Sequence, residues 1–174
     1  MELRQHLIQW ERRRPDWVVG AVAGFAAGAV LMVLDLLWST VVDPGGPWRT
    51  SHMIAPIFTG ADAARAPNYD FSVGVVAIAL AVHYVVGIVF GLILAAIMTP
   101  LHLDSTLEKA IGTGAVFGVV LYVVNFYGLV HLFPWLAELR GWPTIGAHLV
   151  FGVVAALLYA KLGRTAPVKS STAG

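Results

Sequence analysis

Long apolar runs constrain this chain more than any other feature of its sequence. Three or four of them approach or exceed the ~18–20 residues that a helix needs to cross a hydrocarbon layer ~30 Å thick. Hydrophobic residues make up 58% of the 174 residues and charged residues 12%, about half the charged share of a soluble domain. We therefore expect an integral membrane protein with an all-α fold, a bundle of four membrane-spanning helices.

Prolines, glycines and the ends of the apolar runs set the limits of these helices. The predicted helices lie at about residues 17–42, 71–98, 107–132 and 143–162. Together they make a membrane domain over residues 17–163, with a long outer loop at 43–70 whose apolar segment, Met53–Phe58, is expected at the mouth of the bundle. Residues 1–16 predict an amphipathic cytoplasmic leader, and residues 164–174 a disordered cytoplasmic tail.

Two pairs of apolar stretches share the spacing of their small and polar residues. In the second and fourth helices the matching positions are His83, Gly87 and Gly91, and His148, Gly152 and Ala156. In the first and third helices they are Gly24, Gly28, Met32 and Asp35, and Gly114, Gly118, Tyr122 and Asn125. The pattern predicts two copies of one helical hairpin, related by an axis along the membrane normal.

Glycines at a spacing of four residues predict close contacts between helices. Gly20, Gly24 and Gly28 form one smooth stripe, and small residues at this spacing let helix backbones approach each other in lipid. The same packing role is expected for the matching glycines of the other helices, which are Gly87, Gly91, Gly114, Gly118 and Gly152. The stripe on the first helix fits either the internal hairpin or a homodimer, and the sequence does not decide between them.

The repeat also places four polar residues at a similar depth in the membrane. At ~1.5 Å per helical residue, Asp35, His83, Asn125 and His148 all lie roughly 20–27 Å from the cytoplasmic ends of their helices, in the outer leaflet. An ionisable group inside a membrane costs several kcal/mol unless it has a partner or water. We therefore expect these residues to form a shared ligand or proton site. The candidates for extending it are Tyr84, Tyr122, Tyr127 and His131.

Three uses of this polar set are consistent with the residue types. It could hold the helices in register through hydrogen bonds. It could titrate protons or bind a transported molecule, because imidazole titrates near neutral pH. It could bind haem or a divalent metal, with His83 and His148 as the ligands. The last use is not favoured, because two histidines and one carboxylate are few for a metal site.

Charge sets the expected orientation of the chain and excludes several partners. Lysines and arginines are concentrated on one side of the predicted membrane, so both termini are expected in the cytoplasm of a bacterial inner membrane. The eight on that side are Arg4, Arg12, Arg13, Arg14, Lys109, Lys161, Arg164 and Lys169, and the three on the other are Arg49, Arg65 and Arg140. The net charge is +1, and no basic–aromatic pattern indicates a nucleic-acid partner. No nucleophile–base pair, phosphate-binding loop or dinucleotide fingerprint is present, so we expect no enzyme activity.

The second half of the chain resembles the YagU-like family of small bacterial inner-membrane proteins. The resemblance rests on the stretch from Val82 to Phe90, on residues 112–134 and on the stretch from Ile145 to Phe151, and it covers roughly residues 75–163. It implies a multi-pass inner-membrane protein without an assigned catalytic activity, linked in general terms to acid tolerance. It brings no catalytic residues to this chain.

The leading hypothesis is therefore a non-enzymatic inner-membrane protein whose outer-leaflet Asp/His site senses protons or binds a small ligand, as part of acid-stress tolerance. Two alternatives from other classes remain open at this point. One is a small oligomeric transporter or channel. The other is a haem- or metal-binding subunit of a larger membrane complex. The expected surroundings are the lipid bilayer and either a second copy of the chain or a partner within such a complex.

Overall fold

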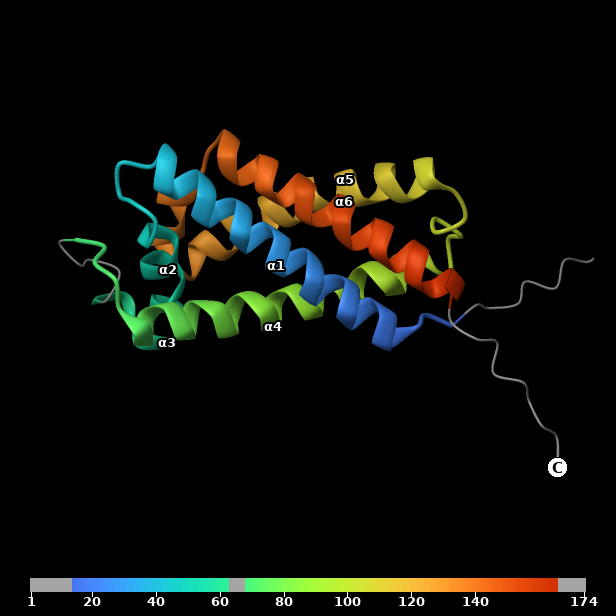
Figure 1. Cartoon of the computed structure of the whole chain (residues 1–174), viewed down its shortest axis with the longest axis horizontal. Helices are drawn as coiled ribbons and strands as arrows, with labels where there is room; N and C mark the ends of the chain where they lie inside the picture. Colours follow the sequence, from blue (N-terminus) through green and yellow to red (C-terminus); the bar gives the residue numbers. More distant parts are fainter. Residues whose placement is uncertain (1–13, 63–67, 166–174) are drawn as a thin grey trace, which may run out of the picture.

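The computed structural model describes residues 14–62 and 68–165 and is built on four long helices (Figure 1). These are α1 (Trp17–Val41), α4 (Val73–Met98), α5 (Leu107–Val123) and α6 (Trp142–Thr165). Each is long and apolar enough to cross a membrane, α5 together with the helical turns that follow it. No strand occurs in the described ranges, so the predicted all-α, four-helix membrane fold is confirmed. Most of the predicted leader and tail, and Arg65, lie outside the described residues.

Polar residues fix the points at which three of these helices begin. Asp16, Ser72 and Thr106 each accept a hydrogen bond from the backbone amide three residues further on, at 3.0, 3.5 and 3.3 Å. The first amides of a helix have no partner within the helix, so a side-chain acceptor at this position stabilises its start. Because Ser72 is such a cap, α4 begins at Val73, two residues later than the sequence predicted.

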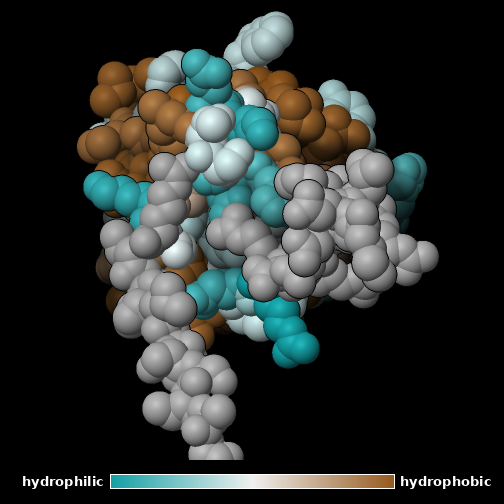
Figure 2. Space-filling model, turned by 90° about the vertical axis from the view of Figure 1, so that its right-hand side faces the viewer, coloured by the Kyte–Doolittle hydropathy of each residue, from teal (hydrophilic) through white to brown (hydrophobic). Residues whose placement is uncertain are grey.

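The long helices pack as two hairpins in chain order. α1 lies along α4, α5 lies along α6, and α1 also packs against α6 and so joins the two hairpins. α1 begins and α6 ends at one end of the bundle, where the turn between α4 and α5 also lies; we call it the terminal end (Figure 1). The opposite end, with the other connections, is the loop end. Seen from the terminal end, hydrophilic residues gather on the end face and hydrophobic residues lie around its sides (Figure 2).

Glycines bring the two helices of each hairpin into backbone contact. A Cβ atom placed on Gly24 would collide with the carbonyl of Gly87, and one placed on Gly114 would collide with the carbonyl of Gly152. These are matching positions of the two hairpins, so both hairpins pack in the same register there. Gly20 likewise lies against the backbone of Gly91. The glycine stripe on α1 therefore serves the internal hairpin.

The terminal half of the bundle is closed by small residues and one hydrogen-bonded tyrosine. The fully buried core there includes Ala23, Ala95 and Ala155, whose small side chains let the helices pack closely. The Tyr159 hydroxyl lies 2.6 Å from the Thr99 hydroxyl and accepts from the Asp16 amide at 3.2 Å. This contact links the start of α1, the end of α4 and the last turns of α6.

The loop end is covered by short helices. They are α2 (Arg49–Ile54), α3 (Pro56–Thr59) and η4 (Pro134–Leu139). The Met53 side chain is completely buried, and the Trp135 indole donates to the Met53 carbonyl at 3.0 Å. Arg49 pairs with Asp43 at 3.1 Å and donates to the Glu138 carbonyl at 3.3 Å. Burial lowers the pKa of Arg49, but its hydrogen bond to Asp43 and the charge of that carboxylate outweigh burial and raise the pKa overall.

The third membrane helix departs from the continuous α-helix that the sequence predicted. After Val123 the backbone forms a π-helical turn, η2 (Val124–Gly128), and then a 3-10 turn, η3 (Leu129–His131). A π-helical turn adds one residue per turn and shifts the faces of the helix around it, and such turns occur often at functional sites. Asn125, one of the four predicted site residues, lies in η2.

The glycine contacts predict unequal effects of two substitutions on the same helix. Gly114→Ala is expected to destabilise the protein by about 1–3 kcal/mol, because its methyl group would press on the α6 backbone. Gly112→Ala is the matched control, since nothing lies within 4 Å of a Cβ at Gly112. Reversible unfolding in mixed micelles, followed by circular dichroism, measures the free energy of unfolding of both variants. Equal stability of the two variants would show that α5 and α6 are not packed through Gly114.

Candidate functional site

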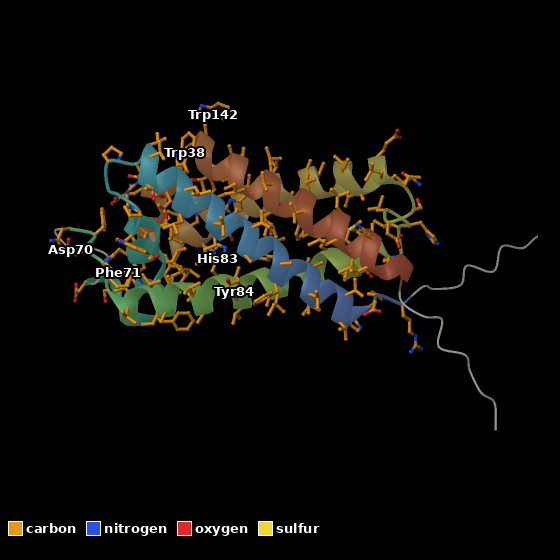
Figure 3. All side chains as sticks on the ribbon, in the orientation of Figure 1. Trp38, Asp70, Phe71, His83, Tyr84 and Trp142 are labelled. Carbon is orange, nitrogen blue, oxygen red and sulfur yellow. The ribbon has the colours of Figure 1, made fainter. Side chains whose placement is uncertain are left out.

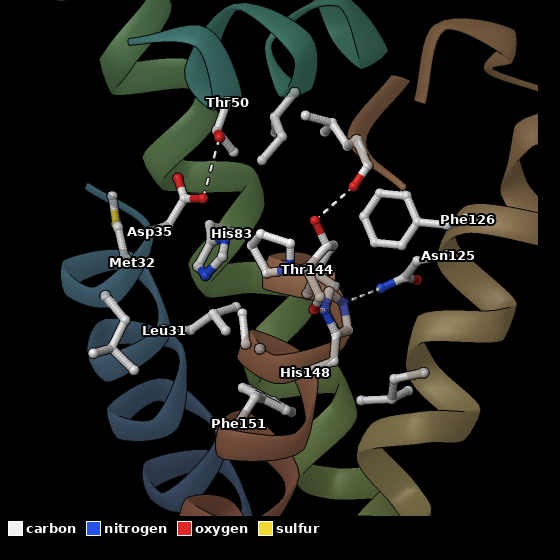
Figure 4. Close-up of a pocket in the computed structure, with 18 of the residues that line it drawn as sticks. Leu31, Met32, Asp35, Thr50, His83, Asn125, Phe126, Thr144, His148 and Phe151 are labelled. Carbon is white, nitrogen blue, oxygen red and sulfur yellow. Dashed lines mark hydrogen bonds between the residues drawn. The ribbon is translucent and has the colours of Figure 1, made fainter. Parts of the chain in front are cut away.

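A cavity of ≈ 780 Å³ lies between the four long helices in the loop half of the bundle. All four predicted site residues line it, each from a different helix: Asp35 from α1, His83 from α4, Asn125 from η2 and His148 from α6 (Figure 4). The cavity is in the size range of pockets that hold small molecules, which are typically ~300–1,000 Å³. The structure therefore brings the predicted polar set together around one space.

Apolar residues lie on both sides of this polar level. Towards the terminal end, Leu31 and Leu121 line the cavity one turn below Asp35 and Asn125. The rings of Phe90 and Phe151 form its floor, edge to face with centroids 6.3 Å apart.

Residues of the short helices cover the cavity at the loop end. They are Thr50, Ser51, Ile54 and Ile57 from α2 and α3, and Leu136 and Leu139 from η4. The cavity is therefore mostly apolar, with polar groups concentrated at one level.

His148 has a defined hydrogen-bond state on the second hairpin. Its Nδ1 lies 2.8 Å from the Thr144 carbonyl, which can only accept, so Nδ1 carries a proton. Its Nε2 lies 3.2 Å from the amide nitrogen of Asn125, which donates to it. Both ring nitrogens are used, and the imidazole is neutral in this arrangement.

The π-helical turn that carries Asn125 is held from the loop end. The Arg140 side chain donates from Nε to the Phe126 carbonyl at 2.7 Å, and its guanidinium lies 4.3 Å from the centre of the Tyr127 ring. Phe126 belongs to this turn, so Arg140 supplies a side-chain donor to the backbone of the π-helical turn. Phe126 itself packs edge-on against the His148 ring, with centroids 5.4 Å apart.

Asp35 and His83, on the first hairpin, are less fully paired. Asp35 accepts one hydrogen bond, from the Thr50 hydroxyl at 3.2 Å. No lysine or arginine in the described ranges forms an ion pair with it. The His83 ring forms a hydrogen bond with the Gly28 backbone, and its imidazole points towards the cavity (Figures 3 and 4). Between the described side chains of Asp35 and His83 there is no hydrogen bond, although both line the cavity.

The residues predicted to extend the site are mostly placed elsewhere. Tyr84 stacks on Phe25 with centroids 4.5 Å apart, Tyr127 lies under Arg140, and His131 is exposed. None of these lines the cavity. Tyr122 does not line the cavity either, but its ring packs edge-on against the His148 ring, with centroids 6.0 Å apart.

Sequence reasoning missed three residues that support the site. Thr144 lies four residues before His148, so helical spacing could have indicated it. Thr50 and Arg140 reach the site from connections that are distant in sequence, and no local pattern marked them.

The donor set does not fit a metal ion held by three or more protein side chains. No group of three or more His, Asp or Glu side chains within residues 14–62 and 68–165 is arranged to hold a metal ion. Of the two histidines proposed as ligands, His148 already uses both ring nitrogens. A ligand nitrogen needs a free lone pair, which leaves His83 as the available imidazole of the two.

No family model, curated protein or solved structure matches the chain. The resemblance to the YagU-like family therefore stays a prediction.

The hydrogen bonds of His148 predict its protonation state directly. In a sample labelled with nitrogen-15 at histidine, we expect Nδ1 of His148 to give the signal of a protonated nitrogen and Nε2 that of an unprotonated one, because of the Thr144 and Asn125 contacts. His148→Gln assigns the signals, and the exposed His131 is the reference for a ring in solvent. A neutral His148 with its proton on Nε2 would contradict the contact with Asn125.

Proposed function

We propose that this chain is a non-enzymatic, multi-pass protein of the bacterial inner membrane that binds a small molecule in the cavity between its hairpins. The observation that carries the proposal is the convergence of Asp35, His83, Asn125 and His148 from four helices on one cavity of ≈ 780 Å³. A largely apolar pocket with a few convergent polar groups is the usual form of a small-molecule site.

The hydrogen-bond pattern supports Asp35 and His83 as the groups that meet the molecule. Asn125 and His148 bind each other, and Thr144 completes the pairing of His148. The Asp35 carboxylate has the Thr50 hydroxyl as its partner and keeps room for further donors. Because an incompletely paired polar group in a membrane is costly, a bound molecule that pairs with it gains affinity.

Charge distribution supports an orientation with the terminal end in the cytoplasm. Lys109 and Lys161 lie near the terminal end, and Arg49 and Arg140 lie at the loop end. Together with the basic residues near the termini, this favours the loop end on the periplasmic side. A part in acid tolerance remains a proposal that rests on the family resemblance and on the presence of two histidines in the cavity.

A channel through the bundle is less well supported. The cavity ends at Phe90 and Phe151, and below them Ala23, Ala95 and Ala155 are completely or almost completely buried. Transport would therefore require the terminal half to open, while binding in the loop half requires no such change.

The proposal predicts that the protein retains a small molecule through its polar site. Wild-type protein, purified from its membrane in mild detergent, is extracted with organic solvent, and the extract is analysed by mass spectrometry. We expect one molecular species at a fixed ratio to protein. Its amount should fall in both Asp35→Leu and His83→Leu, and by roughly 10- to 150-fold in Asp35→Leu, because loss of a hydrogen bond to a charged group costs ~1.5–3 kcal/mol.

His131→Leu is the matched control, since His131 is exposed and does not line the cavity. This variant should retain as much of the small molecule as the wild type. A wild type that retains nothing, or three variants that retain equal amounts, would contradict the proposal.

A further inference from the structure

We infer that the cavity is entered sideways from the lipid, through an opening between the loop halves of α1 and α6, and that it takes an elongated amphiphile with a hydroxyl head. This inference rests on the proposed function and adds the route of entry and the chemical class of the ligand. We call the opening the lateral portal and define it by Leu34 and Trp38 on α1 and by Trp142, Gly146 and Val150 on α6.

The portal residues line the cavity, and all but Gly146 have exposed side chains. Leu34 is 40% exposed, Trp38 47%, Trp142 87% and Val150 36%. A side chain that borders a cavity and remains this exposed marks a place where the wall is open. All four side chains are apolar or aromatic, as expected of an opening that faces lipid.

The spacing of the portal residues places them along two facing helix edges. Leu34 and Trp38 are four residues apart, and Trp142, Gly146 and Val150 follow each other at four-residue intervals, so each set lies on one face of its helix. α1 and α6 pack against each other, and Trp38 and Trp142 both lie at the loop end (Figure 3). One turn after Trp142 on α6, Gly146 has no neighbouring atom within 4 Å of where its Cβ would be.

The two ends of the cavity are covered. At the loop end, the buried Met53 side chain and the hydrogen bond from Trp135 hold the short helices over it. At the terminal end, Phe90 and Phe151 close its floor. A molecule dissolved in the bilayer therefore reaches the site more directly than one dissolved in water.

The lining selects the chemistry of the ligand. Among residues 14–62 and 68–165 no lysine or arginine lines the cavity, and the Asp35 carboxylate would repel an anionic head. A hydroxyl can donate its hydrogen to the Asp35 carboxylate or to the ring nitrogen of His83 that is not bonded to the Gly28 backbone. The apolar residues on the terminal side of the polar level, Leu31, Phe90 and Phe151, would bury an aliphatic tail.

The test uses full-length protein in lipid vesicles with a photoactivatable probe, a long-chain primary alcohol carrying a diazirine in its chain. Light is applied at increasing times after the probe is added, and labelled peptides are identified by mass spectrometry. We expect labelling of peptides that contain Phe90 and Phe151. The matched probe is the fatty acid of the same length, studied at a pH where it is ionised, and it should label these peptides much less.

The route of entry is tested by substitutions that narrow the portal from either side. Gly146→Trp and Leu34→Trp should each slow the rate at which the alcohol labels the cavity. Gly112→Trp is the control, because Gly112 also has open space around it but does not line the cavity, and it should label at the wild-type rate. Unfolding in mixed micelles shows whether each variant is folded. If one portal variant does not fold, the other alone is enough to test the route of entry.

The outcomes separate the inference from the proposed function. Wild-type labelling rates in both portal variants would overturn the lateral portal while leaving the binding site in place. The same conclusion would follow if only Val86→Trp slowed labelling, since Val86 lines the cavity on α4, outside the two helices that define the portal, and is 38% exposed. Equal labelling by the fatty acid would overturn the proposed head group. No labelling of the cavity by either probe would count against the binding site itself.

Discussion

Backbone contact between helices at glycine is the constraint on which the rest of this structure depends. In lipid the hydrophobic effect does not drive helices together, so close packing and polar contacts must do so. Gly24 against Gly87 and Gly114 against Gly152 set the register of the two hairpins. One turn further along, this register places His83 beside Gly28, and His148 beside Gly118. The position of both histidines in the loop half therefore follows from the glycine contacts.

The two hairpins use their polar residues differently. On the second hairpin, Asn125, His148 and the Thr144 carbonyl satisfy one another, and Arg140 holds the π-helical turn that makes this possible. On the first hairpin, Asp35 has one hydroxyl partner and is not bonded to His83. The two hairpins thus have similar backbones but different polar pairs. Asn125 and His148 are bonded to each other, whereas Asp35 and His83 are not. In a membrane, where unpaired polar groups are costly, this asymmetry favours the unbonded pair as the place where a ligand binds.

The sequence was sufficient to predict the fold and the four residues that share the cavity, because both depend on helical periodicity. Apolar run length predicted the spanning helices, and equal spacing from the helix ends predicted a common level for Asp35 and Asn125. The π-helical turn, and the roles of Thr50 and Arg140, depend on contacts between segments far apart in the chain, which no local pattern encodes. The proposed extension through Tyr84 and His131 was not found, because neither residue lines the cavity.

The most direct test of this account is whether Asp35 and Asn125 face each other across one space. The chain contains no cysteine, so a double variant with Asp35→Cys and Asn125→Cys has two thiols. This variant is treated with short bifunctional thiol reagents. Cleavage at a protease site inserted in the turn between α4 and α5 then shows whether the two hairpins are joined. The control replaces Val124, which is next in sequence, exposed and outside the cavity lining. The account predicts cross-links between positions 35 and 125 and few between 35 and 124; equal cross-linking of both pairs would contradict it.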